Sequence, residues 1–284
     1  MIEESEMKFP DFHTVQIMAI VNVTDDSFYE GSRVTELLAI EHRIAQVVAA
    51  GATIVDIGGY SSRPGAADVP LEQEWQRVDM GLAAARKVAK DVAVSVDTFR
   101  SEIVRRAVAK YGAVIVNDIT AGEGDSSMFN TVAELGVPYV AMHMRGTPQT
   151  MQSQTEYVDV VEQVTQYLRD RVAELERCGV RRENIILDPG FGFAKSIEQN
   201  YTLLRHLDRI CSLGCAVLVG LSRKSMIYKV LDTVPENALA GTVALNWQAL
   251  VNGATILRVH DVEPAAQIVK IFREYTDDKG YRDL

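Results

Sequence analysis

The stretch IMAIVNV at residues 17–23 is a short apolar run with one polar residue, Asn22, near its end. Seven further runs of this kind follow, at residues 53–57, 92–96, 113–116, 138–142, 184–187, 216–220 and 255–259. They are rich in Val and Ile and mostly continuous, which is typical of parallel strands buried on both faces. Polar residues stand at or just past the ends of the runs: Asn22, Asp56, Asp97, Asn117, His143, Asp188, Ser222 with Lys224, and Arg258 with His260.

Amphipathic segments of helical length separate the runs, at residues 37–50, 71–90, 101–110, 129–135, 157–178, 197–210, 238–251 and 263–275. We expect Ser101 to cap the third of these helices. Eight strand–helix units without a linker predict an α/β fold, a (β/α)8 TIM barrel, in one domain over residues 1–284. Residues 1–12 would then be an N-terminal extension. An open doubly wound sheet with a small second domain is the alternative, and it suits eight regular units less well.

Composition narrows the classes of partner. The 284 residues carry a formal net charge of −10, which argues against a nucleic acid held by a broad basic surface. No apolar stretch approaches the roughly 18 residues of a membrane span, and residues 1–10 are too polar for a signal peptide. Cys178, Cys211 and Cys215 show neither a CxxC pair nor zinc-ligand spacing. We therefore expect unreactive thiols, no membrane partner and a cytoplasmic location.

Three acidic or amide side chains follow different runs: Asp97, Asn117 and Asp188. In a barrel, the C-terminal strand ends form the active-site mouth, so the three would converge there. A carboxylate accepts two adjacent N–H groups, and an Asn side chain donates and accepts at once. Such a set suits a flat heterocycle with several N–H donors. Capping of loop backbone explains any one of these residues more simply, but three on different strands favour a ligand.

Basic groups near the last two runs indicate an anionic ligand. Lys224 lies in the segment SRKS at residues 222–225, where a helix can open and bind phosphate or carboxylate. Arg258 and His260 are two residues apart, so they point to the same side and can clamp an anion. The alternatives are a solvated basic turn at Lys224 and a pairing of Arg258 with an acidic neighbour such as Asp261.

The loop at residues 58–70 carries Gly58, Gly59 and one cation, Arg63. It suits a lid that closes over phosphate, or equally a plain surface loop. His143 suits either a general base or a packed side chain at a strand end, and packing is favoured. The sequence shows no Ser–His–Asp triad, metalloprotease signature or P-loop. Catalysis by positioning and by stabilising a leaving group is the simplest remaining interpretation.

At these same residues the chain resembles the dihydropteroate synthase family of the folate pathway. The segments that carry the resemblance are IVNVT (20–24), DSF (26–28), DIGG (56–59), RPGA (63–66), SVDT (95–98), NDI (117–119), MHMRGTP (142–148), DPG (188–190), SRKS (222–225) and RVHD (258–261). They span nearly the whole chain in family order. The resemblance implies a (β/α)8 enzyme, usually a homodimer. It would join 6-hydroxymethyl-7,8-dihydropterin diphosphate to p-aminobenzoate, releasing pyrophosphate and dihydropteroate.

The resemblance also implies roles for single residues. The pterin would be held by Asp97, Asn117, Asp188 and Lys224, with Arg258 beside its ring and with Ile119, Met142, Phe193 and Gly220 in the pocket. The diphosphate would meet Asn22, Arg63 and His260, with Mg2+ bound at Asn22. The p-aminobenzoate side would be formed by Phe28, Ser62, Pro64 and Ser222. The residues expected to act in catalysis are Asn22, Arg63, Asp97, Lys224, Arg258 and His260. The pterin ring can delocalise charge, so pyrophosphate would depart before the amine attacks.

Several positions depart from the usual family pattern: Asp25 for Pro, Tyr60-Ser61-Ser62 for Glu-Ser-Thr, Thr120-Ala121 for Ser-Gly, and Ala194 for Gly. Two alternatives stay open, and the departures motivate the second of them. One is a pterin-binding methyltransferase that uses a corrinoid partner and would not need Arg63, Lys224 and His260 as a diphosphate set. The other is a paralogue that binds pterin diphosphate without condensing it.

Overall fold

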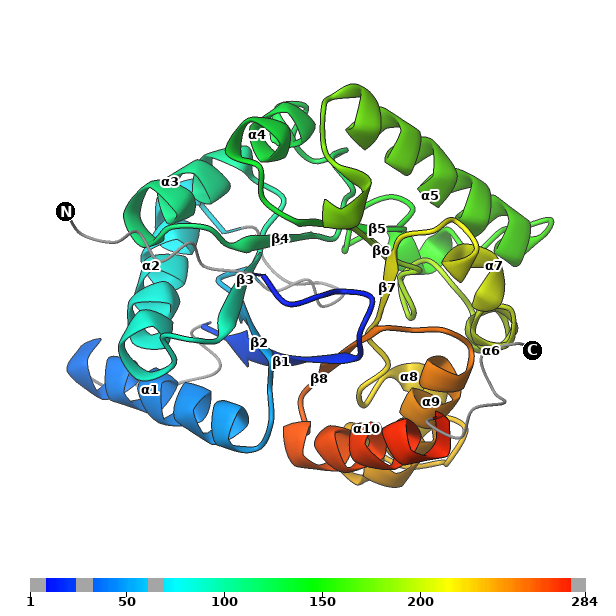
Figure 1. The fold of residues 1–284 in the computed structure, drawn as a ribbon. Coiled ribbons are helices and arrows are strands. Elements are labelled where there is room, and N and C mark those ends of the chain that lie inside the picture. The colour runs from blue at the N-terminus through cyan, green and yellow to red at the C-terminus, as the bar shows by residue number, and fades with distance from the viewer. Residues whose placement is uncertain (1–8, 24–32, 61–68, 277–284) are drawn as a thin grey trace.

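Eight parallel strands close into one barrel, in which each strand pairs with its sequence neighbours and β8 returns to β1 (Figure 1). The computed structural model describes residues 9–23, 33–60 and 69–276. The strands are β1 (Gln16–Asn22), β2 (Ile54–Gly58), β3 (Ala93–Asp97), β4 (Ile115–Asp118), β5 (Tyr139–Met142), β6 (Ile185–Asp188), β7 (Ala216–Val219) and β8 (Ile256–Val259). The predicted (β/α)8 barrel is therefore confirmed, and the open doubly wound sheet is wrong.

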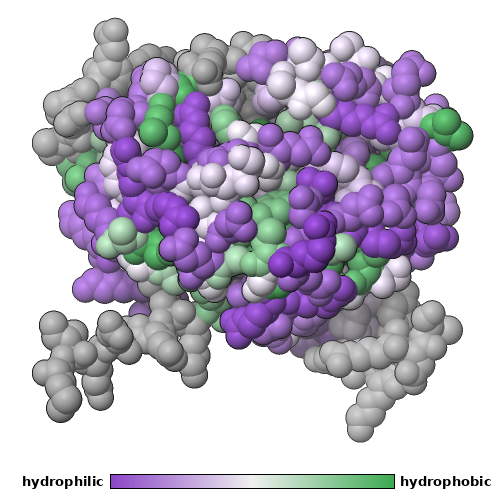
Figure 2. Space-filling view, turned by 90° about the horizontal axis from the view of Figure 1, so that it is seen from above, coloured by the Kyte–Doolittle hydropathy of each residue, from purple (hydrophilic) through white to green (hydrophobic). Residues whose placement is uncertain are grey.

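Helices surround the barrel as an outer ring (Figure 1). They are α1 (Arg33–Ala49), α2 (Leu71–Val88), α3 (Ser101–Tyr111), α4 (Met128–Leu135), α5 (Val160–Arg177), α6 (Ile197–Arg205), α7 (Asp208–Cys211), α8 (Ser225–Tyr228), α9 (Leu239–Val251) and α10 (Val262–Thr276). Single 3-10 turns lie at η2 (Met151–Ser153), η3 (Arg182–Asn184) and η4 (Pro235–Asn237). No helix in the described ranges combines the length and apolar character of a membrane span. The side of the molecule seen in Figure 2 is largely hydrophilic, with apolar residues in small separate groups.

Alternation along each strand separates two apolar layers. Alternate side chains from all eight strands meet inside the barrel: Met18, Ile54, Ala93, Ile115, Val140, Ile186, Ala216 with Leu218, and Ile256. Phe12 packs against this inner cluster from the segment before β1. The intervening side chains, such as Val55, Val116 and Leu257, pack outward against the helices. Because both faces are buried, the strands read as nearly continuous apolar runs.

Two local expectations are wrong. Ser101 is the first residue of α3 and does not cap it; its backbone N–H and Oγ instead donate to Asp125 Oδ2, at 2.8 and 2.6 Å. A carboxylate from the next strand–helix loop thus satisfies a helix end. The expected helix at residues 197–210 is broken between α6 and α7. There the side chain of Asn252 donates to the carbonyl of Leu204 at 2.7 Å, and Leu207 turns fully into the core.

Candidate active site

The inward alternation that builds the apolar layer also places polar side chains at the mouth of the barrel. On four strands, a polar residue follows the inner-layer residue by two positions and so points to the same side. These polar residues are Asp56, Asn117, Asp188 and Arg258, which follow Ile54, Ile115, Ile186 and Ile256. The strand register sets Asp97 beside Asn117, and Asp188 beside Met142. The structure thus brings together the predicted heterocycle-binding residues Asp97, Asn117 and Asp188 at one end of the barrel.

A network of charged and polar side chains joins four of the strands, β2, β3, β4 and β8. Arg258 Nε donates to Asp56 Oδ2 at 2.7 Å, and Arg258 Nη2 donates to Asp97 Oδ2 at 2.8 Å. Asn117 Nδ2 donates to the same Asp56 oxygen at 3.1 Å. Asp261 does not take part, because it accepts from Arg223 Nε and Nη2 at 2.8 and 2.9 Å. Arg258 thus does pair with acidic side chains, as the alternative interpretation expected, but its partners are Asp56 and Asp97 at the site and not Asp261.

Burial changes the acid–base properties of this network. It raises the pKa of Asp97 to about 7 against the attraction of Arg258, and it raises the pKa of Asp188 against the attraction of Lys224. Burial also lowers the pKa of Lys224 to about 8, although Asp188 opposes that shift. Acidic and basic groups with shifted pKa values gathered in one place are a common mark of a functional centre.

Lys224 reaches the site from the loop after β7. It stands just before α8, so a helix does open at SRKS as expected. However, α8 has only four residues, so anion binding there rests on the Lys224 charge and not on a helix dipole. Its Nζ donates to the carbonyl of Phe191 and lies 4.8 Å from the ring centroid of Phe193. The ammonium therefore lies near an aromatic ring and is attracted electrostatically by Asp188.

An apolar wall lines one side of the same mouth. It is formed by Ile119, Met142, Met144, Met151 and Ala194, with Phe193 packed against it. Gly220 lies near two of the site's cations, because a Cβ there would lie 3.9 Å from both Arg258 Cβ and Lys224 Nζ. Met144 and Met151 were not predicted from the sequence, since methionine in a loop carries no local signal. Apolar side chains beside convergent polar groups suit a planar heterocycle.

Two of the residues expected at the diphosphate and p-aminobenzoate sites lie together. His260 Nδ1 is 3.0 Å from Ser222 Oγ, and the His260 backbone N–H lies 3.3 Å from the same oxygen. Asn22 ends β1, and the register sets it beside Gly58. The other predicted residues, Phe28, Ser62, Arg63 and Pro64, lie outside the described residues, as do Asp25 and Ser61.

His143 is packed and not exposed at the mouth. Only 2% of it is accessible, and its ring meets Tyr167 edge-on at 4.9 Å between centroids. Burial, with Lys195 and Arg145 nearby, lowers its pKa to about 2. The interpretation of His143 as a packed side chain is therefore confirmed, and a role as general base is disfavoured.

The family departures inside the described ranges have local structural counterparts. Ala121 and Ala194, where Gly is usual, adopt positive φ angles of 47° and 49°. Left-handed backbone costs a residue with a Cβ roughly 1–2 kcal/mol. Tyr60 packs edge-on against Phe99 at 5.2 Å, and the guanidinium of Arg100 lies over both rings. These changes flank the mouth and leave its polar network in place.

A metal ion would need ligands beyond the protein here. Within the described residues, no group of three or more His, Cys, Asp or Glu side chains could hold one. Asn22 offers a hard amide oxygen, and a Cβ at Gly58 would lie 3.4 Å from its Oδ1, so the glycine keeps that side open. Mg2+ commonly takes few protein ligands and completes its shell with water and substrate phosphates. The donor set fits such an ion together with a phosphate-bearing ligand.

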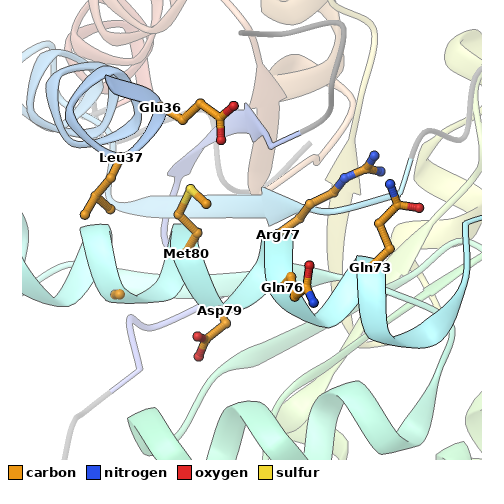
Figure 3. A pocket seen from close by; sticks show the side chains of 8 residues that line it. Glu36, Leu37, Gln73, Gln76, Arg77, Asp79 and Met80 are labelled. Atoms are coloured by element: carbon orange, nitrogen blue, oxygen red, sulfur yellow. The ribbon is translucent and has the colours of Figure 1, made fainter. Parts of the chain in front are cut away.

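A surface pocket between α1 and α2 lies outside the barrel (Figure 3). It is lined by Glu36, Leu37, Gln73, Gln76, Arg77, Asp79, Met80 and Ala83. Two of its charged groups already have protein partners. Arg77 Nη1 donates to the Gly59 carbonyl at 3.1 Å, and Asp79 Oδ1 accepts from Lys110 Nζ at 2.6 Å. We therefore place the candidate site at the barrel mouth.

Comparison with known proteins agrees with this placement. Residues 18–260 match the family described as pterin binding enzyme. The chain is 43% identical to a dihydropteroate synthase of Synechocystis over 90% of this chain and 88% of that protein. It is 40% identical to that of Escherichia coli K12, with 92% of each covered. A structure of Xanthomonas albilineans dihydropteroate synthase with 4-aminobenzoic acid superposes with a TM-score of 0.85 at 40% identity, covering 93% and 94% of the two chains. The chain belongs to the pterin-binding enzyme family.

Proposed function

We propose that this chain is a dihydropteroate synthase, a transferase of folate biosynthesis. It joins 6-hydroxymethyl-7,8-dihydropterin diphosphate to p-aminobenzoate and releases pyrophosphate and 7,8-dihydropteroate. Support comes from relatives of that activity at about 40% identity over nine-tenths of the chain. The observation that carries the proposal is the convergence of Asp97, Asn117 and Asp188 with Lys224 at one mouth beside an apolar wall.

The pterin is the substrate that this mouth recognises. Its ring N–H groups suit the acceptors on Asp97 and Asp188, and the Asn117 amide can donate and accept. Ile119, Met142 and Phe193 supply flat apolar contacts for the ring. Arg258 lies beside Asp97, where it can face the ring. Lys224 adds a positive charge near Asp188, where it attracts electron-rich atoms of the pterin ring.

The chemistry needs positioning more than a nucleophile. The bond from the pterin methylene carbon to the diphosphate oxygen breaks, and a bond to the aniline nitrogen forms with loss of one proton. Asn22, Arg63 and His260 are assigned to the departing diphosphate, and Phe28, Ser62, Pro64 and Ser222 to p-aminobenzoate. The aniline nitrogen is neutral at pH 7, so no strong base is required. Holding both substrates in line supplies much of the rate gain.

We propose Mg2+ as the cofactor, held by Asn22 together with the substrate diphosphate. Its chemical contribution is to neutralise the charge that pyrophosphate carries as it departs. Calorimetry checks the assignment, since Mg2+ should tighten pterin diphosphate binding to the wild-type chain more than to Asn22→Ala. Equal tightening in both proteins would remove Asn22 from this role.

We also propose a homodimer. Helix α10 exposes Ile271 and Tyr275, and Trp247 of α9 packs against Phe272 and Tyr275 at 5.8 and 5.5 Å between centroids. Aromatic and aliphatic side chains of this kind are enriched at subunit interfaces. Light scattering after gel filtration should give twice the chain mass. A monomeric mass at micromolar concentration would contradict the proposal.

One assay separates the synthase from its alternatives. Purified protein is mixed with Mg2+, pterin diphosphate and labelled p-aminobenzoate, and dihydropteroate is measured. The synthase forms labelled dihydropteroate, whereas a non-catalytic paralogue binds the pterin diphosphate and forms none. A corrinoid-dependent methyltransferase binds a pterin without needing its diphosphate. Pterin binding without product would sink the synthase proposal.

A further inference from the structure

Asp56 is a buried carboxylate at the mouth that the proposed reaction does not yet use. Only 1% of its surface is accessible, and its Oδ1 has no hydrogen-bond partner among the described residues. A buried carboxylate is costly unless its surroundings compensate the charge. All its direct hydrogen bonds in the described ranges run through Oδ2, to Arg258 and Asn117. Both of these residues are assigned to the pterin site.

The contact with Asn117 decides how that amide faces its ligand. An ionised carboxylate only accepts hydrogen bonds, so the Asn117 Nδ2 must point toward Asp56. The Asn117 carbonyl oxygen and its second N–H are then the groups left for a ligand. Without Asp56, the amide could turn over at little steric cost and exchange its donor and acceptor positions.

The contact with Arg258 keeps Asp97 available. Arg258 bridges Asp56 through Nε and Asp97 through Nη2, at 2.7 and 2.8 Å. When an N–H of the ligand donates to Asp97 in place of Arg258, the guanidinium still has Asp56 as a buried counter-ion. If the Asp56 charge were removed, the guanidinium would depend on Asp97 alone and would compete with the ligand for it.

We propose that Asp56 is a positioning residue that sets the donor and acceptor pattern of the pterin site, by fixing the Asn117 amide and anchoring the Arg258 guanidinium. This inference rests on the proposed function. It assigns no contact between Asp56 and the substrate.

Asp56→Asn tests the role with no change in side-chain size. Calorimetry should show at least about a tenfold loss of affinity for pterin diphosphate, the effect of losing a hydrogen bond to a charged group. The KM for p-aminobenzoate should stay within about twofold, which a general structural fault would not achieve. Asp118→Asn is the matched control, because Asp118 is fully buried but bonds Tyr139 Oη and the backbone N–H of Gly122. We expect it to lower the melting temperature and to keep the affinity.

A double-mutant cycle with Asn117→Ala identifies the route. The combined loss should be smaller than the product of the two single losses, because Asp56 acts partly through that amide. Losses that multiply fully, or a folded Asp56→Asn protein with wild-type affinity, would overturn the proposal. If Asp56→Asn does not fold, the double variant Asp56→Asn/Asn117→Asp can replace it, because swapping the two side chains preserves charge and volume. The folded double variant should bind pterin diphosphate weakly, and wild-type affinity would also refute the role. Failure of the wild-type chain to bind pterin diphosphate would instead refute the proposed function.

Discussion

Lys195 Nζ lies 3.0 Å from His143 Nδ1, and both side chains are buried behind the candidate site. The same ammonium donates to the carbonyls of Gly190 and Phe193, each at 3.0 Å. One cation thus ties the end of β5 to the loop after β6. That loop also carries the Phe191 carbonyl and the Phe193 ring that meet Lys224. The pair therefore supports the wall against which the pterin is expected to lie.

The first prediction concerns alkaline stability. Burial lowers the pKa of Lys195 from 10.5 to about 7, so between these values the unfolded chain binds more protons than the folded one. The free energy of unfolding should therefore rise with pH across this window through Lys195. Urea denaturation at several pH values should show this rise in the wild type and a flatter curve in Lys195→Met. Parallel curves for the two proteins would contradict the assignment.

The second prediction concerns acid. Burial lowers the pKa of His143 from 6.5 to about 2, so the unfolded chain takes up a proton that the folded chain refuses. The contribution of His143 to stability should be lost progressively as the pH falls below 6.5. Melting temperatures between pH 7 and pH 4 should fall less in His143→Gln than in the wild type. An equal fall in both proteins would show that other groups cause the acid sensitivity.

The third prediction tests the tight turn of the loop after β6. Gly190 adopts a φ of +70°, and an added Cβ would lie 1.9 Å from the His143 carbonyl oxygen. Gly190→Ala should cost more than about 3 kcal/mol, because backbone must move as well as adopt a strained angle. Gly136→Ala is the matched control, with a φ of +64° and nothing within 4 Å of the added atom. It should cost only about 1 kcal/mol. Similar losses in thermal denaturation would argue against the close approach.

Much of the fold could be predicted because its signal is local. Buried parallel strands need apolar side chains on both faces, and barrel closure then sends the residue after each apolar run to the mouth. Asp97 and Asn117 could be placed there from position alone. The break between α6 and α7 and the capping of α3 could not be predicted in this way. They depend on Asn252 and Asp125, which come from distant segments.

Partner choice inside the site was harder to predict. Arg258 selects Asp56, which lies 202 residues away, over the nearby Asp261. The choice follows from direction: Arg258 and Asp56 both point into the barrel, whereas Asp261 follows β8 and meets Arg223. Lys195 was not predicted as part of the site either, since a lone lysine after a Gly-rich segment gives no sign of burial.

The last prediction concerns the charge on Lys224. Burial lowers its pKa to about 8, so the free protein loses this cation as the pH rises through that value. If the ammonium holds the pterin diphosphate, kcat/KM for that substrate should fall above pH 8. Lys224→Arg keeps its charge, so any activity it retains should persist to higher pH, whereas Lys224→Ala should bind the substrate at least about tenfold more weakly. Lys229→Ala, which removes an exposed cation one residue past α8, should leave both affinity and pH profile unchanged. An alkaline limb that persists unshifted in Lys224→Arg would assign it to another group.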